Sequence, residues 1–68
     1  MVFSILTSRE ADGRWIAEVP ELPGVLAYEE TQDLAVAKAK ALALRVVADR
    51  IEHGEMPDGF SGLHFAAA

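Results

Sequence analysis

Residues 19–35, VPELPGVLAYEETQDLA, decide how this chain folds. Pro20 cannot donate a hydrogen bond to a neighbouring strand, and the Pro23-Gly24 pair favours a tight turn. After Thr31 the pattern becomes helical. The stretch therefore predicts a corner between two antiparallel strands, followed directly by the start of a helix.

Strands are expected on both sides of this corner. Residues 2–7 and 14–19 are rich in β-branched and aromatic side chains, and Asp12-Gly13 between them is expected to supply the positive φ angles of a hairpin turn. A third strand follows the corner at residues 24–28. Three strands with one apolar face require a cover.

The expected cover is a helix from Gln32 to about His53. Thr31 can cap its first turn, and Gly54 and Pro57 mark its end. Apolar residues fall on one broad arc of this helix, which we assign to the sheet. The arc consists of Val36, Ala37, Ala41, Leu44, Val47, Ala48 and Ile51.

A second apolar stripe recurs on the same helix, away from much of the first arc. A helix that is apolar on more than one side needs a second neighbour, so this stripe predicts contact between copies of the chain. The alternative is that exposed alanine costs little and that the connection to the last strand covers Leu42 and Val46. The candidate self-association stripe consists of Ala35, Ala39, Leu42 and Val46.

The last segment, FSGLHFAAA at residues 60–68, predicts a short fourth strand with Leu63 and Phe65 on one face and His64 on the other. The fold class is therefore α+β, in the order β-β-β-α-β: a three-stranded antiparallel sheet covered by one long helix, with a short strand after it. We expect residues 1–68 to be a single domain without a separate DNA-binding domain.

Charge and size restrict the function. The chain has 11 acidic and 6 basic side chains, a net charge of −5. An acidic surface repels phosphate backbones and attracts basic proteins, so direct binding of nucleic acid is not expected. No segment reaches the ~18 apolar residues of a membrane span and no signal peptide is evident, so a cytoplasmic protein is predicted. A domain this small needs an additional source of stability, and oligomerisation or a partner could supply it.

Catalytic chemistry is not predicted. The chain has no cysteine, and its serines lack a surrounding nucleophile motif. His53 suits a helix C-terminus, where positive charge is favourable. Acidic loop residues, including Glu10 and Asp12, raise the alternative of a magnesium-dependent nuclease, although such loops commonly serve solubility. We therefore expect no catalytic residue, no cofactor and no metal ligand.

The uncovered face of the sheet is the candidate partner surface. Arg14, Glu18, Tyr28 and His64 are expected on it, and this mixture of aromatic and charged groups suits a protein interface. A small sheet also has exposed edges, which are either protected or recruit another chain. An ordinary hydrated sheet face is the alternative.

The corner and the helix start together resemble the HicB-like antitoxin domain of bacterial type II toxin–antitoxin systems, over about residues 2–52. The family's helix start has a capping threonine, an acidic residue and an alanine repeat, as at Thr31, Asp33, Ala35 and Ala39. The family's Pro-acidic-Leu-Pro-Gly corner is matched position by position by Pro20, Glu21, Leu22, Pro23 and Gly24.

The resemblance implies a partial ribonuclease-H-like fold without nuclease activity. Such a domain binds and masks a small basic, HicA-like toxin that cleaves RNA, a role that fits the negative charge. A homodimer or a higher oligomer is also expected. Two other functions stay open: a stand-alone homo-oligomeric structural module, and a vestigial metal-dependent nuclease.

Overall fold

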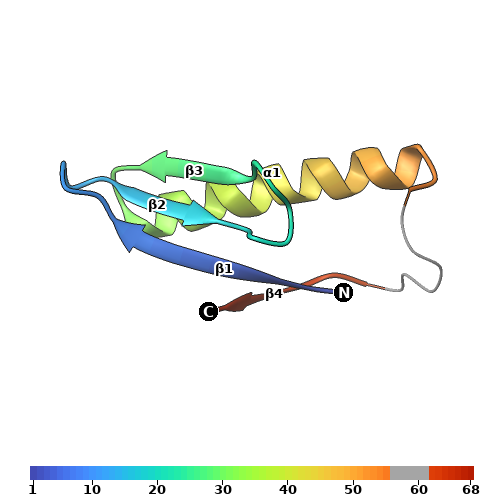
Figure 1. The fold of residues 1–68 in the computed structure, drawn as a ribbon, viewed down its shortest axis with the longest axis horizontal. Helices are drawn as coiled ribbons and strands as arrows, with labels where there is room; N and C mark the ends of the chain where they lie inside the picture. Colours follow the sequence, from blue (N-terminus) through green and yellow to red (C-terminus); the bar gives the residue numbers. More distant parts are fainter. Residues whose placement is uncertain (56–61) are drawn as a thin grey trace.

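The computed structural model describes residues 1–55 and 62–68 of the chain. The elements are β1 (Val2–Arg9), β2 (Trp15–Glu18), β3 (Leu26–Glu29), α1 (Gln32–Glu52) and β4 (His64–Ala67) (Figure 1). The α+β class and the β-β-β-α-β order predicted from the sequence are confirmed. Residues 60 and 61 of the expected last strand, and Pro57 after the helix, lie outside the described residues.

The four strands form one sheet in the order β3-β2-β1-β4. β2 is antiparallel to both of its neighbours, and Glu18 lies opposite Leu6 on one side and Leu26 on the other. β4 joins the far side of β1 in parallel, with Phe65 opposite Phe3. The three expected antiparallel strands are therefore present, and the crossover through α1 adds a parallel fourth strand to them.

The first hairpin turns through Ala11, Asp12 and Gly13. The backbone N–H of Gly13 donates to the Glu10 carbonyl at 2.9 Å, and Gly13 has a φ of 89°. The expectation that Asp12 also takes a positive φ is wrong, because a three-residue turn needs only one left-handed residue. Asp12 instead accepts the backbone N–H of Arg14 through Oδ1 at 3.0 Å.

The predicted corner joins β2 to β3. Val19 donates its N–H to the Val25 carbonyl, and Val25 donates to Leu22, both at 3.0 Å. The bond from Val25 to Leu22 closes a turn with Pro23 and Gly24 at its centre. Gly24 has a φ of 87°, as expected for a left-handed glycine that follows a proline. Leu22 is only 2% exposed, so the corner inserts one side chain into the core.

α1 begins where the sequence predicts. The Thr31 hydroxyl accepts the N–H of Leu34 at 3.2 Å and caps the first turn. His53 caps the other end, and its Nδ1 lies 2.7 Å from the Asp49 carbonyl oxygen. No helix in residues 1–55 and 62–68 combines the length and the apolar character needed to cross a membrane.

The face of α1 that meets the sheet is not the predicted one. The helix packs mainly on β2 and β3, and the side chains of Ala35, Ala39 and Ala43 at this contact are 0% exposed. In the arc assigned to the sheet Val47 is buried and Val36 is partly buried against the core, whereas Leu44 and Ile51 each expose 49% of their surface. The assignment was wrong for most of the arc, because small side chains allow the helix backbone to lie close to the sheet.

The candidate self-association stripe therefore belongs to the monomer's own interior. Ala35 and Ala39 have no exposed surface, and Leu42 and Val46 are partly buried against the core. Ala35 and Ala39 therefore cannot contact a second copy, and Leu42 and Val46 offer it only part of their surface. The buried core on the two sides of this contact comprises Phe3, Ile5, Ala17, Val19, Leu22, Val25, Ala27, Ala35, Ala39, Ala43 and Val47.

α1 is much longer than the strands that it covers. Its 21 residues span about 31 Å, whereas β2 and β3, with four residues each, span about 13 Å. Figure 1 shows the C-terminal turns of α1 extending past both strands. The last part of the helix consequently has little of the sheet beneath it.

Candidate protein-binding surface

One face of the sheet has no cover among the described residues. Side chains alternate along each strand, so that Phe3, Ile5 and Ala17 point toward α1 while their neighbours point away from it. We refer to this second side as the open face. Its residues on β1, β2 and β3 include Leu6, Ile16, Glu18, Leu26 and Tyr28.

The centre of the open face is an apolar row interrupted by one carboxylate. Leu6, Glu18 and Leu26 lie side by side across three strands. Both leucines are exposed, and Glu18 is partly buried between them. Directly opposite side chains on a sheet are about 5 Å apart, so the two leucines flank the carboxylate closely. The row can accept an apolar surface that carries one basic group.

The next row ends in an aromatic side chain held by an arginine. Ile16 lies opposite Tyr28, and the Arg14 guanidinium lies over the Tyr28 ring at 5.2 Å from its centroid. Arg14 Nε also donates to Asp12 Oδ2 at 2.8 Å. A cation between a carboxylate and an aromatic ring is attracted by both, which restrains an exposed side chain at the rim of the open face.

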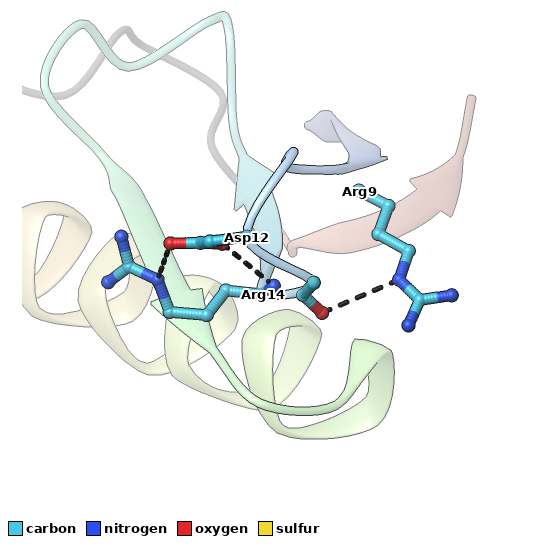
Figure 2. A network of polar contacts seen from close by, with 4 residues as sticks. Arg9, Asp12 and Arg14 are labelled. Carbon is cyan, nitrogen blue, oxygen red and sulfur yellow. Dashed lines mark hydrogen bonds and ion pairs between the residues drawn. The ribbon is translucent and has the colours of Figure 1, made fainter.

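Figure 2 shows this polar network around the first hairpin. The Asp12 carboxylate accepts hydrogen bonds from the backbone N–H and from Nε of Arg14. Both bonds lower the pKa of Asp12, and the bond from the backbone N–H has the larger effect. Arg9 donates from Nε to the Gly13 carbonyl at 3.4 Å and lies 5.9 Å from the Trp15 ring. The two arginines thus brace the hairpin from opposite sides of the sheet.

Three of the four predicted surface residues come together, and one does not. Arg14, Glu18 and Tyr28 gather at the β2 and β3 side of the open face. His64 lies opposite Val2 on β4, which is the other edge of the sheet. The sequence did not reveal that pairing, and it treated the open face as the wetter one. Leu6 shares a face of β1 with Ser4 and Ser8, so strand alternation was the available signal that a leucine lies on the open face.

The corner motif is structural rather than exposed for binding as a unit. Leu22 is buried, while Pro20, Pro23 and Gly24 form the exposed bend around it. The Glu21 carboxylate accepts the backbone N–H of Ser4 on β1. The corner motif therefore joins β2 to β3 and is linked to β1 through Glu21.

The acidic loop residues do not converge. Within residues 1–55 and 62–68 there is no group of three or more His, Asp or Glu side chains placed to hold a metal ion. Asp12 is occupied by Arg14, and Glu21 by Ser4.

A groove on the other side of the sheet separates α1 from β4. Its volume is about 270 Å³, and its walls include Ile5, Val36 and Phe65. Lys40 reaches across it, with Nζ 5.8 Å from the Phe65 ring centroid. This contact directs the Lys40 side chain toward β4.

None of the protein-family models, curated proteins or solved structures that were compared with the chain matches it. What this chain binds must therefore be inferred from its own residues. The most developed feature for binding is the open face, with exposed leucines, an aromatic ring and a partly buried carboxylate.

Proposed function

We propose that this chain is a HicB-like, antitoxin-type protein-interaction domain. It binds a small basic toxin that cleaves RNA, and it masks that toxin with the open face of its sheet. The observation that supports this most directly is the row formed by Leu6, Glu18 and Leu26 beside Tyr28. Interfaces typically have such an apolar and aromatic centre with charged groups around it.

The choice of a basic partner follows from charge. The whole chain has a net charge of −5, which accelerates encounter with a positive protein. Glu18 is the carboxylate placed between the two exposed leucines. A basic side chain of the partner that enters between the leucines would pair with Glu18 in a site from which water is excluded.

Masking then requires no chemistry by this chain. A protein that binds RNA needs a positive surface for the phosphates. The same positive surface attracts an acidic domain, so antitoxin and RNA compete for it. The resemblance at the corner and the helix start is the reason for naming the HicB-like family in particular.

The proposal predicts that a gene neighbouring the one for this chain encodes a small basic protein, and the test is binding of that protein. Isothermal titration should give a complex that weakens as salt is raised, and addition of the chain should stop RNA cleavage by that protein. Glu18→Lys and Leu26→Glu should each raise the dissociation constant about tenfold or more. Leu44→Glu on α1 is the matched control and should bind as the unchanged chain does.

Two outcomes would reject the proposal. One is the absence of binding together with undisturbed RNA cleavage. The other is binding that is unaffected by both changes on the open face, since the partner would then occupy another surface. Far-UV circular dichroism of each variant shows that its fold is intact.

A further inference from the structure

The water-exposed side of α1 carries a regular apolar stripe, most of which belongs to the arc that the sequence assigned to the sheet. Leu34 is 53% exposed, and Leu44 and Ile51 are each 49% exposed. No described residue of the chain covers them. We call this stripe the outer seam, and it consists of Leu34, Ala37, Ala41, Leu44, Ala48 and Ile51.

The spacing of the outer seam is that of a helix that packs against another helix. Its residues recur alternately three and four positions apart, which are the a and d positions of a heptad repeat. They span about 26 Å of α1. The side of α1 that packs on the sheet is roughly opposite, at Ala35, Ala39, Ala43 and Val47. A helix that covers one sheet normally has a polar outer side, so this pattern requires another explanation.

We infer that the outer seam is a homodimer interface, in which α1 of a second copy of this chain packs antiparallel to it. Pairing the two ends of the seam places Leu34 against Ile51 of the second copy. The remaining a positions also meet d positions of the second copy: Ala48 meets Ala37, and Ala41 meets Leu44. Each residue of the seam then has a partner in the second copy, and a large side chain meets a small one where Leu44 meets Ala41.

Side-chain size favours the antiparallel arrangement over the parallel one. In the antiparallel pair Leu44 packs over Ala41 of the second copy, and large side chains fill the space left by small ones. A parallel pair would place Leu44 against Leu44 and Ala41 against Ala41, leaving gaps beside the leucines. Antiparallel helices also oppose their dipoles favourably.

The charges beside the seam agree with this arrangement. Lys38 and Glu52 are exposed and occupy the same e position of the heptad, so each lies near the other across an antiparallel pair. Arg45, between them, meets its own copy at the axis. On the other flank Lys40 is directed to Phe65 and away from the seam. This flank therefore has two attractive contacts, between Lys38 and Glu52, and repulsive contacts that Arg45 makes with its own copy and with Lys38.

The size of the seam sets the strength of the dimer. The strip is about 26 Å long and only one helix face wide. The area that it can bury is therefore smaller than the roughly 800 Å² that each partner contributes to a standard interface. We therefore expect a dimer in the micromolar range, which dissociates on dilution. The second helix would also support the turns of α1 that extend past β2 and β3.

Sedimentation velocity over a dilution series tests the interface. The unchanged chain should shift from dimer to monomer as it is diluted, and Leu44→Glu should raise the dissociation constant about tenfold or more. Leu26→Glu is the matched control, because Leu26 is an exposed leucine on the open face. It should dimerise normally while losing the partner proposed above. A monomer at every concentration, or equal effects of both variants, would overturn the inference.

Introduced cysteines test the direction of the helices. The chain has no cysteine, so Ala37→Cys and Ala48→Cys each add a single thiol of nearly the same size as alanine. Under mild oxidation an equimolar mixture of the two should form the mixed disulfide, and each variant alone should form little. Self-linked dimers of each variant alone would show a parallel pair and reject the antiparallel arrangement. An absence of all cross-linking would reject the seam itself.

Discussion

The carboxylate of Glu21 accepts the backbone N–H of Ser4 through both of its oxygens, at 3.0 and 3.1 Å. β2 ends at Glu18, and the strand register continued beyond it would place Pro20 opposite Ser4. Proline has no N–H to donate to the Ser4 carbonyl, so the β1–β2 ladder cannot continue there as a full pair, and the Glu21 side chain provides an acceptor for the Ser4 N–H. Hydrogen bonding by Ser4 lowers the pKa of Glu21.

This contact predicts a pH dependence of stability. A carboxyl group with a lowered pKa in the folded chain contributes fully above its ordinary value of 4.5, and the contribution disappears as the pH falls through the folded value. Glu21→Gln should therefore melt below the unchanged chain at neutral pH, and the two should converge in acid. Melting curves from about pH 7 to about pH 3 test this. A difference that stays constant over that range would contradict it.

The buried leucine of the corner should be essential for stability. Leu22→Ala should cost about 2–5 kcal/mol, since it removes most of a fully buried side chain. A domain of this size has roughly 3–10 kcal/mol in total, so the variant should be partly unfolded. Urea titration followed by the fluorescence of Trp15, the only tryptophan, measures the loss. Leu26→Ala on the open face is the control and should cost less than about 1 kcal/mol.

The glycine of the corner is required by its backbone and not by space. Gly24 has a φ of 87°, and a Cβ added there would meet nothing within 4 Å. Gly24→Ala should therefore cost about 1 kcal/mol, from backbone conformation alone. Gly24→Asn should cost less, because asparagine tolerates the left-handed region. Equal losses for both variants in urea titration would point to a different cause.

A larger side chain should destabilise the fold on one side of α1 and have almost no effect on the other. Ala39→Leu should destabilise the fold by about 1–3 kcal/mol, because Ala39 is fully buried between helix and sheet. Ala37→Leu on the outer seam should change the stability of the monomer by less than about 0.5 kcal/mol. Thermal unfolding at a dilution that keeps the copies apart compares them. An Ala37→Leu variant as unstable as Ala39→Leu would reverse the assignment of the two sides.

Local signals predicted much of this fold. The corner at Pro23-Gly24, the hairpin at Gly13 and the cap at Thr31 are each specified by residues next to one another. Arg14, Glu18 and Tyr28 were predicted on one face because strand alternation has a strict period of two. Leu6 was not, because its place beside Glu18 depends on the register between two strands. The function proposed for this face is still a prediction.

The sequence by itself determined the order of the elements, the turns that join β1, β2 and β3 and the two ends of α1, because each depends on short-range backbone preferences. Tertiary structure decided which side of α1 is buried. The helix has apolar residues of its own on more than one side, so periodicity did not show which side is buried. Close approach to the sheet selected alanines over the larger Leu44 and Ile51. It also decided that β4 pairs with β1, since that contact joins residues that are far apart in the chain.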